Sequence, residues 1–229
     1  APAVDLPSAD ALLLASYEAV GGLEALRAQE NRTTTGRLSI PAQGLTVSLV
    51  IRQQAPDRME TVSEVPGMGT TVQGTDGTLV WSVDSVSGPR LLEGAEANGV
   101  LRRAQYDWMA DLDRWFPVRE TVSLEAFNGE PSWKVRLVDS DGAEEFHWFS
   151  EASGLAIGQQ ATVVSDMGTL TVQSLFGDFQ DADGVLMPMK LTQKMGPMEL
   201  VTVIDSVEVN QAGFAEITVP AELAPQPEP

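Results

Sequence analysis

The sequence has 229 residues, of which 43% are apolar, and it carries a formal net charge of −19. This length suits one sizeable core, and the acidic balance disfavours binding to nucleic acid or to anionic membrane faces. Cysteine is absent from the sequence, which excludes disulfides, thiol nucleophiles, cysteine-type zinc sites and iron–sulfur clusters. No segment approaches the roughly 20 apolar residues that a membrane helix needs, so we expect a soluble protein.

The N-terminal part predicts an arm followed by two helices. Residues 1–7 are expected to form the arm, and Ser8 has the character of an N-cap that precedes an apolar helical pattern over 12–20. Gly21 and its following glycine predict the end of this helix, since glycine is the usual residue just past a helix C-terminus. A second, short helix is expected over 23–29.

From about residue 33 onward the pattern changes to a period of two. Apolar and mostly polar residues alternate in four clear segments, which predicts strands with one apolar face. The alternating apolar residues are Leu45, Val47, Leu49 and Ile51; Leu79, Trp81 and Val83; Trp133, Val135 and Leu137; and Val185, Met187, Met189 and Leu191. Turn signals such as Asp76-Gly77, Asn128-Gly129 and Asp183-Gly184 separate the segments and predict an antiparallel meander.

One long helix is expected to interrupt the strands over residues 97–116. Its apolar residues step by three or four, and Pro117 follows as a stop. The stripe consists of Ala97, Leu101, Ala104, Trp108, Leu112 and Trp115. We expect this helix to dock on the sheet, which is compatible with its acting as a movable lid.

The residues that usually carry catalysis are sparse. The single histidine, His147, lies in an alternating segment with Phe146 and Trp148 on the apolar side, and we expect it to be an exposed strand residue. The sequence contains no G-x-S-x-G, P-loop or H-E-x-x-H motif. Aspartates near glycines, over 178–183 and 139–141, are interpreted as acidic turns and not as calcium sites. We therefore expect no catalytic residue, no metal site and no cofactor.

The eight methionines are not scattered evenly along the chain. Four of them, from Met187 to Met198, lie within twelve residues, and Met68 and Met167 each precede a glycine at an expected hairpin tip. Methionine is unbranched and polarisable, so it can repack around cargo of varied shape. Core filling explains the strand methionines, whereas methionines at turns are expected to rim a cavity or to touch the lid helices.

A series of short segments carries a family resemblance through its order and spacing, from about residue 8 to residue 210. The segments are YEAVGG at 17–22, TTTGRLSIPAQG at 33–44, APDRM at 55–59, PGMG at 66–69, GTDGTLVW at 74–81, GPRLLEG at 88–94, NGEPSWKV at 128–135, FSEASGL at 149–155 and DGVLMP at 183–188. Together they resemble the LolA/LolB-type lipoprotein-carrier superfamily, and more closely its longer exported relatives, the outer-membrane lipoprotein-sorting proteins.

This resemblance implies a fold that is mainly β with α. It implies a single curved antiparallel sheet, an incomplete β-barrel, with helical lids over the concave face and an apolar hollow for acyl chains. The carrier domain is expected over residues 8–219. A Pro- and Glu-rich tail at 220–229 is expected to be disordered.

The resemblance also implies the site, the cargo and the compartment. Lipoprotein acyl chains or another lipid are the expected cargo, with a membrane-bound donor and acceptor protein as possible partners, no nucleic acid and no enzymatic activity. We expect an exported, soluble protein of the periplasm of a Gram-negative-type bacterium, and the start at Ala1 fits cleavage of a signal peptide. The residues expected to bind lipid are Leu45, Val47, Leu49, Ile51, Met68, Trp81, Trp108, Leu112, Trp115, Trp133, Trp148, Met187 and Met189.

A second hypothesis comes from a different functional class. The same fold can serve as an interaction or sensor module, or as a subunit, that binds a protein partner and needs no lipid.

Overall fold

The computed structural model describes residues 6–107, 111–165 and 168–224 of the chain. In these residues thirteen strands form one sheet, with the order β6-β5-β4-β3-β2-β1-β13-β12-β11-β10-β9-β8-β7. The end strands β6 and β7 do not pair with each other, so the antiparallel sheet is open. The predicted fold class, mainly β with α and a single antiparallel sheet that does not close, is confirmed.

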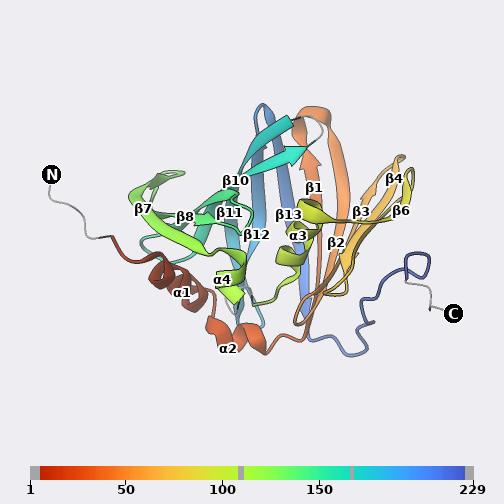
Figure 1. Cartoon of the computed structure of the whole chain (residues 1–229), viewed down its shortest axis with the longest axis horizontal. Coiled ribbons are helices and arrows are strands. Elements are labelled where there is room, and N and C mark those ends of the chain that lie inside the picture. The colour runs from red at the N-terminus through yellow and green to blue at the C-terminus, as the bar shows by residue number, and fades with distance from the viewer. Residues whose placement is uncertain (1–5, 108–110, 166–167, 225–229) are drawn as a thin grey trace. The chain divides into compact units, whose positions relative to one another are not determined.

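The elements follow the chain in a simple order, and most are labelled in Figure 1. The helices are α1 (Ala9–Ala19), α2 (Gly22–Arg27), the 3-10 turn η1 (Pro41–Gln43), α3 (Gly94–Ala104) and α4 (Leu112–Trp115). The strands are β1 (Asn31–Ile40), β2 (Leu45–Gln54), β3 (Arg58–Val65), β4 (Gly69–Thr75), β5 (Val80–Asp84), β6 (Gly88–Leu91), β7 (Val118–Phe127), β8 (Glu130–Val138), β9 (Glu144–Ser150), β10 (Ala156–Ser165), β11 (Gly168–Ala182), β12 (Val185–Met195) and β13 (Met198–Val209).

The chain divides into two compact units, which we describe one at a time. Unit 1 comprises Ala1–Leu26, Ile40–Gln43 and Met109–Thr202, and unit 2 comprises Arg27–Ser39, Gly44–Trp108 and Val203–Pro229. Unit 1 therefore holds α1, most of α2, α4 and β7 to β12, whereas unit 2 holds most of β1, then β2 to β6 and α3; β13 is divided between them. The predicted boundaries at 1–7, 8–219 and 220–229 stay a prediction.

Helix α1 begins and ends where the sequence predicts. The Ser8 hydroxyl accepts a hydrogen bond from the Ala11 backbone N–H at 3.2 Å, which is an N-cap. The helix ends before Gly21, whose φ of 121° favours glycine. A side chain at Gly21 would also bring its Cβ to 2.1 Å from the Gly184 carbonyl oxygen, so this end of α1 lies directly against the β11–β12 turn.

Two predicted hairpin turns have the backbone that their residues favour. Asn128 and Gly129 have φ values of 49° and 85°, and Asp183 and Gly184 have values of 55° and 82°. Two successive left-handed residues match the right-handed twist of paired strands, and Asn-Gly and Asp-Gly adopt this conformation at least cost. These turns fix the register of β7 with β8 and of β11 with β12.

The register of unit 1 divides its side chains between two faces, because directly paired residues in antiparallel strands point the same way. Arg119 and Thr121 of β7 pair with Leu137 and Val135 of β8. Arg119 donates to Asp10 in the first turn of α1, and Thr121 donates to the carbonyl of Pro7, just before the N-cap. We call this side the helix face of unit 1. It includes Trp133, and the pairings through β9, β10 and β11 extend it to the odd-numbered residues of β12.

In unit 2 a different helix covers one face of the strands. The buried core consists of Met59, Val80, Leu92, Ala97, Val100 and Ala104, with Ile51 and Leu101 packed against it. Because Ile51 and Met59 lie on this side, α3 covers the face that carries the odd-numbered residues of β2. We call it the α3 face.

The opposite face of unit 2 has another cover. Arg52 donates to the Ala215 carbonyl and lies 4.7 Å from the centre of the Phe214 ring. Arg58 donates to the Ile217 carbonyl at 3.1 Å, and the Ile217 side chain is buried. The segment that follows β13 therefore packs on the face of these strands that α3 leaves uncovered.

The prediction of one continuous helix over 97–116 is wrong. Helix α3 ends at Ala104, and α4 begins only at Leu112. Between them the Tyr106 N–H donates to the Pro56 carbonyl at 3.0 Å, and the tyrosine ring is buried with the Arg32 guanidinium 5.2 Å from its centre. Asp107 forms an ion pair with Arg27 at 2.7 Å. These contacts of unit 2 hold the backbone out of the helix, although the apolar spacing continues.

Burial of Tyr106 predicts a specific loss of stability at high pH. Desolvation raises the pKa of its hydroxyl to about 12 in the folded chain, from 10.0. Stability that depends on the neutral phenol is complete below pH 10 and is lost as the pH rises from 10 to about 12. We expect Tyr106→Phe to remove this part of the pH dependence, so that its melting temperature falls less between pH 9 and pH 11.

The measurement is thermal unfolding followed by circular dichroism at both pH values. Comparing each variant with itself cancels the cost of losing the weak 3.4 Å hydrogen bond from the Tyr106 hydroxyl to the Gln53 carbonyl. Equal falls in the two proteins would contradict the prediction.

Candidate functional site

The residues predicted to bind lipid fall into both units. Trp108 lies outside the described residues. Those in unit 2 are Leu45, Val47, Leu49, Ile51, Met68 and Trp81, and those in unit 1 are Leu112, Trp115, Trp133, Trp148, Met187 and Met189. That either set binds lipid stays a prediction.

In unit 2 the β2 residues share a face, but Trp81 does not share it with them. The alternating residues Leu45, Val47, Leu49 and Ile51 lie on the α3 face, where Val47 is buried and the other three are half-buried. Trp81 pairs with Gly74, which pairs with Glu60, on the opposite face. Its ring lies directly over Gly74, because a Cβ there would be 2.6 Å from a ring carbon.

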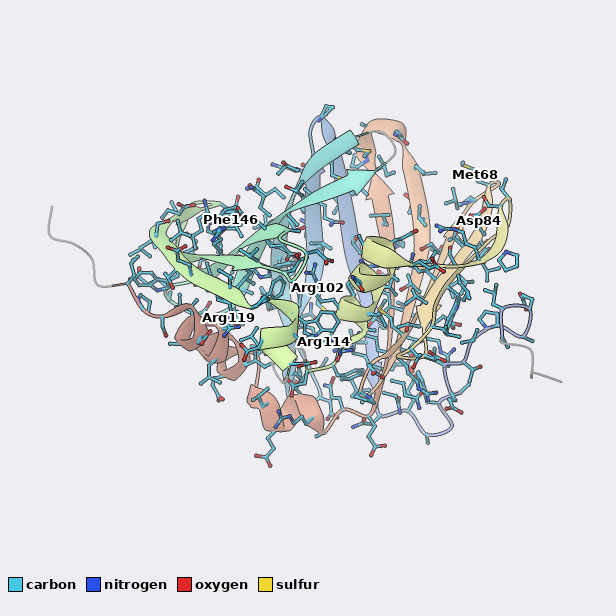
Figure 2. The ribbon with its side chains drawn as sticks, in the orientation of Figure 1. Met68, Asp84, Arg102, Arg114, Arg119 and Phe146 are labelled. Atoms are coloured by element: carbon cyan, nitrogen blue, oxygen red, sulfur yellow. The ribbon has the colours of Figure 1, made fainter. Side chains whose placement is uncertain are left out.

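Met68 occupies the β3–β4 turn of unit 2, and its side chain is 71% exposed. The β5–β6 turn is bonded to the start of β4, since the Ser85 N–H donates to the Thr70 carbonyl at 3.1 Å. Asp84, labelled near Met68 in Figure 2, accepts from the Val86 and Ser87 N–H groups at 2.8 and 3.0 Å. Within unit 2 Met68 is therefore presented to solvent on a well-bonded turn.

In unit 1 the register again separates two tryptophans that the sequence groups together. Trp133 pairs with Phe149 on the helix face, which also carries Met187 and Met189. Trp148 pairs with Lys134 and therefore points to the opposite face. The three helix-face residues Trp133, Met187 and Met189 are half-buried, so their apolar surface is only partly covered within the unit.

Short helix α4 contributes two of the predicted residues. Trp115 is buried and Leu112 is half-buried. The Arg114 guanidinium lies 4.6 Å from the centre of the Trp115 ring. The ring of the next residue, Phe116, lies 6.4 Å from the His147 ring on the helix face.

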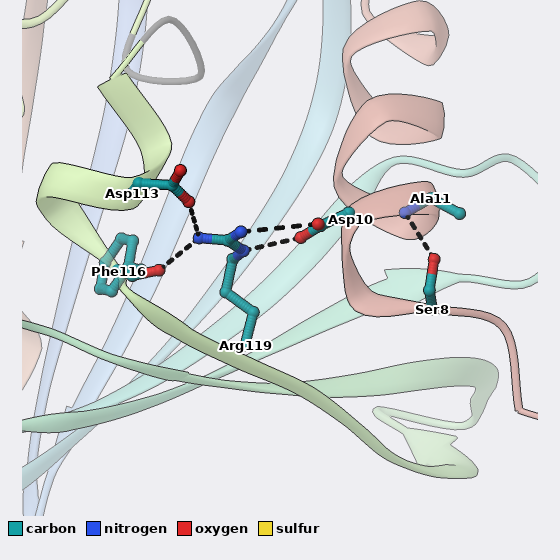
Figure 3. Close-up of polar contacts among 6 residues, drawn as sticks. All are labelled: Ser8, Asp10, Ala11, Asp113, Phe116 and Arg119. Carbon is teal, nitrogen blue, oxygen red and sulfur yellow. Dashed lines mark hydrogen bonds and ion pairs between the residues drawn. The ribbon is translucent and has the colours of Figure 1, made fainter.

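An arginine on β7 ties α1 and α4 of unit 1 to the sheet, as Figure 3 shows. Arg119 Nε donates to Asp10 of α1 at 2.6 Å, and Nη1 donates to Asp113 of α4 at 2.8 Å and to the Phe116 carbonyl at 2.6 Å. The arginine side chain is only 15% exposed, and its hydrogen bond with Asp10 raises the pKa of the guanidinium. One charged side chain thus holds α1 and α4 over the helix face.

The α3 face of unit 2 carries a polar network where the helix ends. Arg32 Nε donates to Gln53 Oε1 at 3.2 Å, and Arg103 Nη2 donates to Gln73 Oε1 at 3.2 Å. Burial lowers the pKa of both arginines, and the charge of neighbouring Arg102 lowers that of Arg103 further. The apolar β2 residues therefore adjoin two cationic groups that are partly desolvated.

The expectation that His147 is exposed is wrong. Its side chain is 15% exposed, its Nε2 lies 3.2 Å from Glu145 Oε2, and the rings of Phe116 and Phe149 flank it. Glu145 is buried and also accepts from Gln159 Nε2 at 2.8 Å. Among the described residues no serine or threonine hydroxyl bonds to His147.

The acidic groups that could suggest calcium form turn contacts. Asp139 accepts from the Asp141 and Ala143 N–H groups at 3.0 and 2.8 Å, and Asp181 accepts from the Gly184 N–H at 3.3 Å. In the described residues no cluster of three or more His, Asp or Glu is arranged to hold a metal ion. No helix of the described chain has both the length and the apolar character needed to cross a membrane.

Sequence reasoning missed two hollows on the face of unit 1 opposite the helix face. Their volumes are about 360 and 240 Å³, and both are lined by Phe127, Asn128, Leu175 and Thr192. Of the predicted residues only Trp148 lines them. An available signal was that Lys190 and Lys194, two of only three lysines, lie four residues apart on one strand.

Comparison with solved structures identifies the fold. A LolA superfamily protein from Nitrosomonas europaea matches with a TM-score of 0.63 over 93% of this chain and 99% of that chain, at 14% identity. This chain has a LolA-type fold. A DUF1329 family protein from Desulfovibrio piger and a domain described as an outer membrane lipoprotein-sorting protein from Vibrio parahaemolyticus match with TM-scores of 0.60 and 0.58; each match covers 88% of this chain and 94% of the other at 10% identity.

Comparison of the sequence finds no match, either to a family model or to a curated protein. The resemblance inferred from the order of short segments is thus confirmed in three dimensions. At identities of 10–14% the likeness to these structures is one of fold. What a LolA-type fold does in this protein has to be argued from its own residues.

The Arg119 contacts predict that this residue matters more than a neighbouring exposed arginine. Arg119→Gln removes hydrogen bonds to two carboxylates and a carbonyl, and we expect it to lower the free energy of unfolding by about 1–2 kcal/mol. The matched control is Arg114→Gln, which removes an exposed pair with Asp111 and a contact with the Trp115 ring and is expected to cost less than about 1 kcal/mol. Urea unfolding of both variants checks this, and equal costs would contradict the role assigned to Arg119.

Proposed function

We propose that this protein is a periplasmic carrier that holds lipoprotein acyl chains or another lipid against the helix-covered faces of its strands. The observation that carries the proposal is incomplete cover of apolar side chains. Trp133, Met187 and Met189 on the helix face of unit 1 remain half-buried, and in unit 2 the α3 face carries half-buried leucine and isoleucine side chains of β2. A sheet face that existed only to form a packed core would bury these side chains more completely.

The physical gain from such binding is large. Each CH₂ group of an acyl chain that leaves water contributes about 0.8 kcal/mol, so even partial contact with these rows favours transfer from water. The methionines add adaptability, since their unbranched side chains repack around chains of different shape. The likeness of the fold to a domain described as lipoprotein-sorting supports the same cargo class.

The proposal includes no catalytic step. The one histidine is engaged with Glu145 between two phenylalanine rings, and the described part of the chain puts no hydroxyl nucleophile on it. A carrier needs none, because loading and unloading change only non-covalent contacts.

We further propose that a membrane-bound donor loads the carrier and a membrane-bound acceptor unloads it, outside the cytoplasm. The net charge of −19 supports this division of labour, since an acidic surface does not adsorb to anionic membranes by itself. Delivery then depends on protein partners and not on general attraction to lipid.

A fluorescent fatty acid provides the direct test. We expect saturable binding by the wild type, and at least about tenfold weaker binding in Met189→Asp and in Leu49→Asp, because a carboxylate on either face is costly to bury beside an acyl chain. The first variant probes unit 1 and the second probes unit 2.

The matched control is Thr171→Asp, an exposed β11 position on the face of unit 1 opposite Met189, and it should bind as the wild type does. Circular dichroism establishes that each variant is folded. If the folded wild type binds no apolar probe, or if Thr171→Asp weakens binding as much as Met189→Asp, the carrier proposal fails.

A further inference from the structure

A groove with two hollows lies on the face of unit 1 opposite the helix face. The larger hollow, of about 360 Å³, adds Trp148, Gln173 and Lys194 to the shared lining, and the smaller, of about 240 Å³, adds Ile157 and Lys190. Phe127, the last residue of β7, and Asn128 of the following turn border both hollows. The hollows thus follow one another along β12.

The Phe127 ring, which borders both hollows, is held rigidly in place. The Phe127 ring stacks on the Trp148 ring with centroids 4.5 Å apart and an interplanar angle of 23°, and both are buried with Ile157 in one cluster. A Cβ at Gly158 would lie 2.2 Å from a Phe127 ring carbon, so only glycine lets this ring lie against the sheet. The shape of the groove therefore exists before any ligand arrives.

Two charged side chains beside Phe127 and Trp148 already form contacts within the protein. Glu125 accepts from the Trp148 indole N–H at 2.9 Å, and this bond lowers the pKa of Glu125. Lys134 lies 3.5 Å from the same carboxylate, with its ammonium 4.8 Å from the centre of the Phe146 ring, which is labelled in Figure 2. These contacts fix the indole ring and leave neither charge available for a ligand.

The other two lysines of the chain, Lys190 and Lys194, differ from Lys134 in their contacts. Lys190 and Lys194 both point to this face, and among the described residues neither forms an ion pair, although the chain has 33 carboxylates. Four residues of strand separate them, which is about 13 Å. The groove thus offers one exposed ammonium group in each hollow, with Thr192 and Leu175 between them.

We propose that this groove binds an extended polypeptide segment in which two carboxylate side chains, four residues apart, flank a central apolar residue. An extended segment has the same rise per residue as β12, so its carboxylates meet Lys190 and Lys194 together. The central apolar side chain then rests on Leu175 and Phe127.

The polar lining favours a peptide over an acyl chain. Gln173 and Asn128 carry amide groups, and an acyl chain would desolvate them without offering a hydrogen bond. A peptide backbone supplies both donors and acceptors. Glu130, Asp178 and Glu199 also line the hollows, so further acidic residues in the segment are repelled and basic flanking residues are favoured.

This inference does not depend on lipid carriage. Of the residues predicted to bind lipid only Trp148 borders the groove, and the helix face lies on the other side of the same strands. A partner can therefore dock on the groove whether or not cargo is bound.

The test uses the full chain and a fluorescein-labelled nonapeptide, Arg-Gly-Glu-Thr-Leu-Thr-Glu-Gly-Arg, followed by fluorescence anisotropy at low salt. We expect saturable binding that weakens about tenfold when Lys190→Gln and Lys194→Gln are combined. The matched control combines Arg37→Gln with Arg114→Gln, which removes the same charge at exposed positions outside the groove and should leave affinity unchanged. All four positions are exposed, so the variants should fold.

Altered peptides test the pattern itself. Replacing both glutamates by lysine should abolish binding, and replacing the leucine by serine should weaken it severalfold. The proposal is overturned if the wild type shows no saturable binding up to millimolar peptide, or if the lysine-containing peptide binds equally well. It is also overturned if a fluorescent fatty acid binds and is lost in the Lys190 and Lys194 double variant, since the groove would then be a lipid subsite.

Discussion

Cross-strand register is the constraint on which the two units depend. Alternate side chains of every strand point to opposite faces, so one pairing such as Trp133 with Phe149 decides the side of each residue before and after it. Both faces of these strands carry apolar residues, and each face needs its own cover. In unit 1 the cover comes from α1 and α4 on one side and from Phe127 on the other, and in unit 2 from α3 and from the segment around Ile217.

This two-sided arrangement explains which parts of the fold the sequence could predict. Helix ends and turns depend on neighbouring residues, so the Ser8 cap, the glycine after α1 and the left-handed Asn128-Gly129 turn could be recognised without tertiary information. The choice of inner face could not, because in β5 both Val80 and Trp81 are buried, on opposite sides. Alternation identifies a strand. It cannot show which of two apolar faces is buried when the segments that cover them are distant in the sequence.

The same limit applies to the interrupted helix and to the histidine. The apolar stripe from Ala97 to Trp115 satisfies helical spacing, yet the buried Tyr106 and its bond to the Pro56 carbonyl outweigh local propensity. His147 has the polar position of an alternating strand, and it is covered because Phe116 arrives from α4. In each case the deciding partner is remote along the chain, and no periodicity within the segment encodes it.

The contact between Phe127 and Gly158 has a consequence for how this molecule can vary. The phenylalanine ring occupies the space that a methyl group at position 158 would fill, so a single added carbon expels the ring from its stack on Trp148. The lining that the two hollows share would change while every polar lining side chain remained in the sequence. A substitution survey that replaces large side chains by alanine and passes over glycines would overlook this dependence of the surface on position 158.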